Sequence, residues 1–352
     1  MSDTTVAGAT TAPAAGRRVT PTGRLLLEHT APRDIWLEAR RKGLGSSDLA
    51  KVLNLTGFGT PQQVFHDKVG NLPLDDDDFS EPAHFGTLFE DPLARDWARR
   101  NRTVVAPVGI IANESDPWQM CTLDRLCTEC PLDRSVRALC ALEVKCRDKM
   151  LAKFWRQGPP DDVLAQVLWQ IIVTGLDHIH VVCLIGGNDY RQYTVRREDH
   201  VKLVAYINAE ASRLWHEHIL TGREPEITGA EAADALVDLY GRLHPDRDGV
   251  IEVDRDLDAL DAMSEYLEAV AEKGAAEKKR KAKYAELLKT LGGAQAAMYQ
   301  DRPFFSIEQS SKATADLDRL REEFPDAYRA CVQDKTHDRI AIPQYVREEF
   351  TS

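Results

Sequence analysis

The sequence predicts a mixed α/β fold: a mixed central β-sheet flanked by helices, followed by a helical C-terminal arm and a small α+β tail. Short apolar-polar alternations between residues 103 and 195 are typical of strands. Segments of helical periodicity, bounded by Pro and Gly, lie before and between them. A longer helical pattern runs from Leu257 to Leu291. These three observations favour a sheet domain with a helical appendage.

Composition agrees with a soluble globular chain. The 352 residues are 43% hydrophobic and 29% charged, enough for one large domain with an appendage or for two domains. No apolar run approaches the roughly 20 residues of a membrane span, and no signal peptide opens the chain, so we expect a cytoplasmic protein without membrane contact. The net charge of −12 argues against a protein that coats nucleic acid non-specifically.

Three regions follow from changes in composition. Residues 1–22 are rich in Ala, Thr, Gly and Pro without periodicity, which predicts a disordered tail. Residues 23–225 hold the core, and Gly222 to Pro225 ends its last helix. Residues 226–352 form the arm and a small α+β cap. In the arm, the cations around Lys278 to Lys281 could contact DNA or could be a solvated helix face.

The first helix is expected from Asp34 into a basic cluster that includes Arg40. After a Gly-rich turn, Ser46 or Ser47 is predicted to cap the next helix. A cation beside a helix N-terminus suits an anion such as a phosphate, while the alternative is a solvated basic face and a plain cap. Thr60 is predicted to cap a third helix. The acidic run Asp75–Asp78 is interpreted as a solvated loop.

Seven cysteines do not indicate a secreted disulfide framework, so reduced thiols are expected. Cys127-x-x-Cys130 has the spacing of half a metal knuckle, and no second CxxC or CxxH accompanies it. A structural zinc or iron–sulfur site and a set of buried thiols therefore remain alternatives. The cysteines in question crowd the predicted strands: Cys121, Cys127, Cys130, Cys140 and Cys146.

The stretch Leu142-Glu143-Val144-Lys145, with Thr122-Leu123-Asp124 upstream, is the candidate site. Side chains alternate along a strand, so Glu143 and Lys145 project to one face and the Val144 carbonyl can turn to the same ligand. Two carboxylates and a carbonyl suit a hard divalent cation, and an ammonium can orient or activate a water. The pattern predicts metal-dependent phosphodiester hydrolysis, against the alternative of a solvated strand face.

Two more segments bear on this site. Glu90 lies in or beside the apolar stripe of a helix that opens at Phe85, where a carboxylate either points at a metal or finds an Arg partner. Gln166 and Gln170 lie one turn apart on a helix from Asp162 to Thr174. Buried amides there need partners, which a nucleic-acid strand or a metal-bound water would provide.

The order of these signals resembles the λ-exonuclease-like (YqaJ-type viral recombinase) family of the PD-(D/E)XK nuclease superfamily. The resemblance extends from about Pro32 to Val195. The matching segments are Trp36-x-x-x-Arg40, Gly45-Ser46-Ser47-Asp48, Gly86-x-x-x-Glu90, Thr122-Leu123-Asp124, Leu142-Glu143-Val144-Lys145, and Ala165-Gln166-Val167 with Val173-Thr174.

The resemblance implies a restriction-endonuclease-like core and assigns roles to residues. It makes Lys145 the residue that positions the nucleophilic water and Gln166 a residue that contacts the site. It places Mg²⁺, with Mn²⁺ able to substitute and two ions per site, on carboxylates and a carbonyl. It also places a 5′-phosphate pocket on a further set of residues. The metal ligands are Asp124, Glu143, Val144 and Glu90; the 5′-phosphate residues are Arg40, Ser47 and Thr122.

The implied function is Mg²⁺-dependent exonuclease action on double-stranded DNA ends, 5′→3′, in phage-type homologous recombination. A ring-shaped homotrimer, a single-strand annealing partner and a host-cytosol location for a phage-encoded chain are implied by the same resemblance. Two alternatives remain. One is a Cas4-like exonuclease with a cysteine-held metal cluster, and the other is a catalytically silent DNA-binding module on the same fold.

Overall fold

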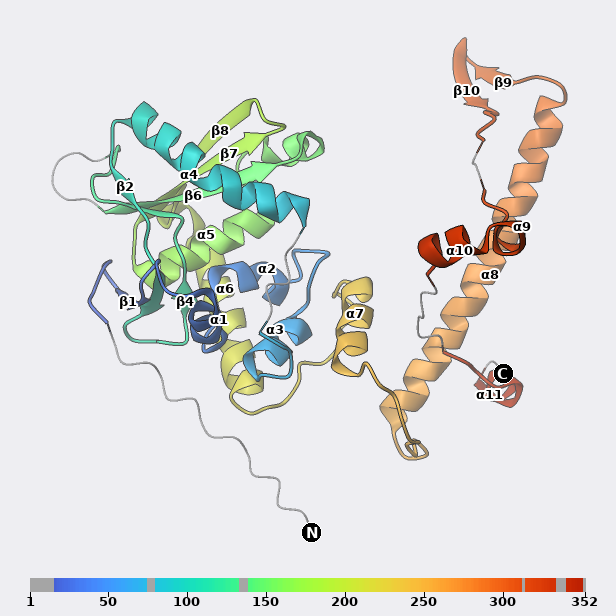
Figure 1. Ribbon diagram of the computed structural model, residues 1–352, viewed down its shortest axis with the longest axis horizontal. Helices are drawn as coiled ribbons and strands as arrows, with labels where there is room; N and C mark the ends of the chain where they lie inside the picture. Colours follow the sequence, from blue (N-terminus) through green and yellow to red (C-terminus); the bar gives the residue numbers. More distant parts are fainter. Residues whose placement is uncertain (1–15, 75–79, 133–138, 312–313, 334–339, 351–352) are drawn as a thin grey trace. The chain divides into compact units, whose positions relative to one another are not determined.

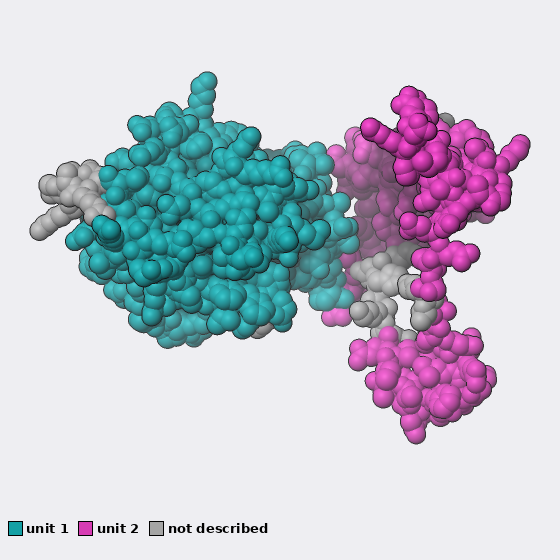
Figure 2. Space-filling model, turned by 90° about the horizontal axis from the view of Figure 1, so that it is seen from above, with its two compact units in different colours: residues 1–245 teal, residues 246–352 magenta. Residues whose placement is uncertain are grey.

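The computed structural model describes residues 16–74, 80–132, 139–311, 314–333 and 340–350. Most of the predicted tail and the acidic run Asp75–Asp78 lie outside the described residues. The chain divides into two compact units, Met1–Pro245 and Asp246–Ser352, which Figure 2 colours separately.

The first unit is built on a five-stranded mixed sheet, as predicted, in the order β2-β5-β6-β7-β8. Only β6 and β7 run parallel; the other neighbours are antiparallel. The long connection between these two parallel strands contains helix α5, as a parallel crossover requires. The strands are β2 (Val105–Ala106), β5 (Arg125–Cys127), β6 (Cys140–Arg147), β7 (His178–Ile185) and β8 (Asp189–Arg196).

A second, three-stranded antiparallel sheet pairs β1 (Gly23–Leu27), β3 (Ile110–Asn113) and β4 (Met120–Cys121). Regular structure therefore starts before Asp34, the residue from which the sequence pattern predicts the first helix. The apolar-polar alternation over Met120–Leu126 predicts one strand there, and this prediction is wrong, because β4 and β5 belong to different sheets. The chain changes sheets between Cys121 and Arg125, and this corner carries Asp124.

Two helices cover the two faces of the central sheet (Figure 1). Helix α4 (Glu81–Asn101) packs Trp97 and its apolar neighbours against Leu142 and Val144 of β6. Helix α5 (Asp161–Thr174) shares the larger core with Ala141 of β6. The alternation along β6 therefore directs Leu142 and Val144 towards α4 and directs Glu143 and Lys145 to the face of α5.

Four short helical elements lie between β1 and α4: α1 (Arg33–Arg41), a 3₁₀ turn (Ser46–Asp48), α2 (Leu49–Val52) and α3 (Pro61–Lys68). Thr60 caps α3 as predicted, since its hydroxyl accepts the Gln63 N–H at 3.2 Å. The predicted serine cap is wrong. Gly45 occupies the cap position, and its N–H donates to the Asp48 carboxylate at 2.8 Å. The carboxylate reaches back across the tight turn to the cap residue's N–H, and neither serine hydroxyl caps the turn.

The first unit ends in α6 (Val201–Arg213), a π-helical turn (Leu214–Ile219) and α7 (Ala233–Leu243). Trp215 of the π-helical turn stacks on Trp118 with ring centroids 5.6 Å apart. This contact lies at the side of the core that α5 and α6 share. No described helix has both the length and the apolar composition needed to cross a bilayer.

The second unit is organised along α8 (Leu257–Leu291), whose bounds match the predicted helical pattern. The helix continues through Gly274 without interruption. Glu277 forms ion pairs with Arg280 and Lys281 within the helix. These pairs agree with a solvated face, and DNA contact by the arm stays a prediction. The remaining elements are β9 (Ala296–Tyr299), β10 (Arg302–Ser306), α9 (Leu317–Glu323), α10 (Pro325–Cys331) and α11 (Gln344–Phe350).

Candidate active site

The buried Glu143 carboxylate is the centre of the site. Its Oε1 accepts from Gln166 Nε2 at 2.6 Å, and its Oε2 accepts from Gln170 Nε2 at 2.7 Å. Lys145, two residues along β6, forms an ion pair with the same carboxylate. The two glutamines share a face of α5, as their spacing predicts, and both bind the strand acid. The carboxylate is only 1% exposed, so these donors replace the water it has lost.

Asp124 lies at the sheet corner, next to β6. Its Oδ2 accepts the backbone N–H of Val144 at 2.6 Å, which fixes the carboxylate beside the Glu143 strand. Burial, together with the negative charge of Glu143, raises the pKa of Asp124 well above its usual range, although Lys145 opposes this. Two neighbouring carboxylates that are shielded from water repel each other, so a positive charge beside them is strongly stabilising.

Lys145 supplies part of that charge. Burial alone would lower the pKa of its amine, but the carboxylates of Glu143 and Asp124 outweigh burial and raise that pKa. The side chain is therefore an ammonium at neutral pH. It can donate hydrogen bonds to a water or to a phosphoryl oxygen.

Glu90 takes the arginine partner that the sequence left open as one of two outcomes. Its Oε1 accepts from Arg125 at 2.6 Å, and Arg125 also binds Asp91 at 3.0 Å. The charge of Glu90 also contributes to the raised pKa of Asp124, so the helix acid belongs to the same acidic neighbourhood. Its side chain is 36% exposed, which leaves the carboxylate accessible to a ligand.

The residues fit a hard divalent cation by their chemistry. Asp124, Glu143 and Glu90 offer carboxylate oxygens, and the repulsion between the first two would fall if a cation lay between them. The Oε1 of Gln170 is buried and has no hydrogen-bond partner among the described residues, so a further oxygen is unsatisfied nearby. Across the described ranges, however, these three carboxylates are not gathered within 4.8 Å of one another.

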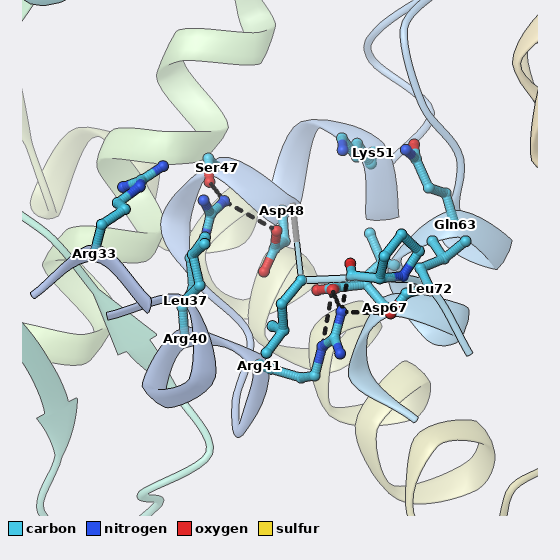
Figure 3. Close-up of a pocket in the computed structure, with 13 residues that line it drawn as sticks. Arg33, Leu37, Arg40, Arg41, Ser47, Asp48, Lys51, Gln63, Asp67 and Leu72 are labelled. Carbon is cyan, nitrogen blue, oxygen red and sulfur yellow. Dashed lines mark hydrogen bonds and ion pairs between the residues drawn. The ribbon is translucent and has the colours of Figure 1, made fainter. Parts of the chain in front are cut away.

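A separate cavity of about 360 Å³ lies between α1, the 3₁₀ turn and α3 (Figure 3). Arg40 reaches into it and binds both the Ser47 hydroxyl and, at 3.5 Å, the Asp48 carboxylate. Arg41 is held by Asp67 at 3.1 Å. Four basic side chains line the cavity, and two acidic ones oppose them. The basic residues are Arg33, Arg40, Arg41 and Lys51; the acidic ones are Asp48 and Asp67.

The electrostatics of this cavity favour an anion. Burial would raise the pKa of Asp48, but Lys68, Arg40 and the Gly45 N–H together hold that pKa far below its usual range. Burial lowers the pKa of Lys51; the charges of Arg40 and Lys68 lower it as well, and the carboxylates of Asp48 and Asp67 oppose this only in part. In the part of the chain that the structure describes, no ion pair neutralises Lys51. An anion in the cavity would stabilise its charged form.

Helix α5 connects the acidic site at Glu143 with the cavity lined by Arg40. Trp169 Nε1 donates to the carbonyls of Leu44, at 3.2 Å, and Met120, at 2.9 Å, which fastens the loop before the 3₁₀ turn to strand β4. One turn of the same helix carries Gln166 and Gln170, which hold Glu143. A shift of α5 would therefore move the cavity wall and the acidic site together.

Thr122 does not line this cavity, and its predicted contact with a phosphate stays a prediction. Its carbonyl accepts from Gln170 at 3.1 Å, so the residue borders the acidic site. Sequence reasoning did not assign roles to Gln170, Arg125 or Lys51. The Gln166–Gln170 spacing was a usable signal for the first, whereas the contacts of Arg125 and Lys51 depend on tertiary packing.

An acid at a sheet corner, a Glu-x-Lys on the adjoining strand and glutamines on the covering helix form the arrangement that the motifs predicted by their resemblance to the PD-(D/E)XK class. Residues 35–177 match the family model of the YqaJ-like viral recombinase domain. This stretch is therefore similar to a YqaJ-like viral recombinase domain, and the resemblance inferred from the motifs is confirmed.

Among curated proteins, the chain is similar to the uncharacterized protein YqaJ of Bacillus subtilis (strain 168). The two are 29% identical over 206 residues, which cover 57% of this chain and 61% of YqaJ. The chain thus spans about three fifths of the length of this relative.

Two solved structures of an alkaline exonuclease from Laribacter hongkongensis, one in complex with dAMP, also match. They are 17% and 18% identical, each at a TM-score of 0.43, and the matches cover 54% of this chain and 93% of the other. Neither likeness is close enough to assign an activity to this chain.

Proposed function

We propose that the protein is a metal-dependent DNA exonuclease that hydrolyses phosphodiester bonds from the ends of linear duplexes in the 5′→3′ direction. The observation that carries the proposal is the group of Asp124, at the corner before β5, with Glu143 and Lys145 on β6: a buried carboxylate with a half-buried acid and a half-buried ammonium beside it. The matched recombinase domain and the cationic cavity support it.

A divalent ion, Mg²⁺ or in its place Mn²⁺, would be held by Asp124, Glu143, the Val144 carbonyl and Glu90. When bound, it would supply charge that polarises the phosphate and lowers the pKa of a water. With two ions at the site, the attacking and leaving oxygens would both be stabilised.

The protein's own residues perform the rest of the reaction. The Lys145 ammonium donates hydrogen bonds to the attacking water or to a non-bridging phosphate oxygen, which stabilises the negative charge that grows in the transition state. Gln166 and Gln170 hold Glu143 in one orientation through 2.6 and 2.7 Å hydrogen bonds. The Val144 N–H does the same for Asp124. The acids are thus oriented before substrate arrives.

The polarity of digestion is proposed from the cavity. A terminal 5′-phosphate would lie against Arg40 and the Ser47 hydroxyl, with Lys51 contributing charge from the far wall. Arginine suits a phosphate because its donors form a planar fork. A strand anchored at its 5′ end would be cut from that end.

The Arg40→Ala variant tests this assignment. We expect it to lose the preference for a 5′-phosphate over a 5′-hydroxyl end, by about tenfold or more, because a charge-assisted hydrogen bond contributes about 1.5–3 kcal/mol. The measurement is the initial rate of digestion of two duplexes that differ only in the 5′ group. Arg213→Ala, an exposed arginine paired with Glu210 on α6, is the control and should keep the preference. An unchanged preference in Arg40→Ala would remove the cavity from the mechanism.

A further inference from the structure

A second group of metal-ligating side chains lies on the opposite face of the sheet from Glu143. The nitrogen and sulfur atoms of Cys130, Cys140, His178 and His180 all lie within 4.8 Å of one another. Each of the four residues is buried, with exposures of 1%, 0%, 9% and 4% in that order. Within the described ranges, no other group of three or more His, Cys, Asp or Glu residues is gathered in this way.

The strand register brings three of these residues together. In the parallel ladder, Ala141 pairs with Ile179 and Leu142 with His180, so Cys140 and His178 come from neighbouring positions at the same ends of the two strands. The alternation of side chains turns Cys140, His178 and His180 to the side of α4, where Leu142 also lies. Cys130, three residues after β5, completes the group with its Sγ 3.1 Å from His178 Nε2 and 4.0 Å from His180 Nε2.

The dimensions suit one tetrahedral ion. Around Zn²⁺, with bonds of about 2.1 Å to nitrogen and about 2.3 Å to sulfur, the ligand atoms would lie about 3.4 to 3.8 Å apart. The four atoms need only small side-chain movements to reach these separations from their present limit of 4.8 Å. In a two-iron cluster, by contrast, each iron would take its own pair of ligands, so the two pairs would stand further apart.

The surroundings suit a neutral metal centre. Two thiolates balance the charge of Zn²⁺, so the assembled site would be uncharged, as a buried site requires. The Nδ1 of His180 lies 3.0 Å from the Thr194 hydroxyl. That hydrogen bond would fix the ring and direct Nε2 towards the ion.

We propose that Cys130, Cys140, His178 and His180 form a structural zinc site. The site joins the chain after β5 to β6 and β7, on the face covered by Trp97 of α4, whose ring centroid lies 5.1 Å from that of His180. Its four ligands come entirely from the protein, which is typical of structural rather than catalytic zinc. The site fastens the connection between β5 and β6, the two strands that carry the acids of the opposite face. Of the Cys127-x-x-Cys130 pair, only Cys130 is a ligand; Cys127 is the cross-strand neighbour of Cys140.

Metal content of the purified full-length chain tests the proposal. After dialysis against a weak chelator, we expect one zinc per chain and no stoichiometric iron by mass spectrometry. On Co²⁺ substitution we expect thiolate-to-metal charge transfer and tetrahedral ligand-field bands, which an all-oxygen site cannot give. A wild-type chain that binds no zinc, even when refolded with zinc chloride, would overturn the proposal. So would iron with sulfide in place of zinc.

Matched variants then test the ligand set. Cys140→Ser and His180→Asn should hold less than a tenth of the wild-type zinc, and a strong chelator should no longer lower their melting temperatures as it lowers that of the wild type. Cys183→Ala, a buried thiol on β7 outside the group, should keep both the zinc and the chelator response. Full zinc in both ligand variants, or loss of zinc in Cys183→Ala, would contradict the assigned set. These readouts do not depend on nuclease activity.

Discussion

Lys145→Ala is expected to lower the rate of DNA hydrolysis by about 10³-fold while duplex binding stays within about threefold of the wild type. Among the residues that the structure describes, its ammonium is the one cation paired with Glu143, and its raised pKa keeps it charged. Its removal takes away stabilisation of the transition state without touching the cationic cavity. The measurement is single-turnover digestion of a 5′-phosphorylated duplex, with binding followed separately in EDTA.

Two further variants support the interpretation of that result. Lys145→Met retains the length of the side chain, so a similar loss of rate would show that charge and not packing is responsible. Lys153→Ala removes a lysine of the first unit whose ammonium lies 4.9 Å from the Phe154 ring, and it should leave the rate unchanged. Hydrolysis by Lys145→Ala within about tenfold of the wild type would rule out the role given to this residue.

Asp48→Asn is expected to destabilise the fold by about 3 kcal/mol or more, because it leaves the buried Lys68 with only the more exposed Asp67 as an acidic partner. Asp48 Oδ2 lies 2.9 Å from Lys68 Nζ, and the two side chains are 8% and 1% exposed. The same carboxylate holds Arg40 and accepts the Gly45 N–H, so the variant should also loosen the cavity wall. Chemical denaturation measures the change.

The pH dependence of stability provides a second measure. The pKa of Asp48 is lowered in the folded state from an ordinary value of 3.8, so its contribution is complete above that pH. As pH falls below about 4, the unfolded chain takes up the proton first and stability decreases. The acid-induced loss should be smaller in Asp48→Asn than in the wild type. Asp67→Asn, whose more exposed carboxylate also pairs with Lys68, should cost about 1 kcal/mol or less. Equal losses in the two variants would contradict this account.

Local patterns predicted the elements that hold the acidic site. The alternation of residues 140 to 147 placed Glu143 and Lys145 on one face of a strand, and helical spacing placed Gln166 and Gln170 on one face of α5. These features depend on two short-range periods, and the structure preserves both. The break between β4 and β5 was missed because a run of alternating residues does not show that the chain changes sheets at Asp124.

Contacts that depend on register were beyond local patterns. Arg125 pairs with Glu90 across 35 residues of chain, which no spacing rule connects. The Cys–His group arises because a parallel pairing aligns Ala141 with Ile179, and sequence alone could not choose that alignment. For the same reason, Cys127-x-x-Cys130 indicated a possible metal site while His178 and His180, from a strand 48 residues or more beyond Cys130, were not connected with it.

The site itself is tested most directly by digesting a linear duplex, labelled at its 5′ or its 3′ ends, with Mg²⁺ or with EDTA, using the wild type and Glu143→Gln. Our account predicts Mg²⁺-dependent release of the 5′ label by the wild type alone, with the 3′-labelled strand shortening progressively. Equal digestion by Glu143→Gln, or digestion that persists in EDTA, would contradict it.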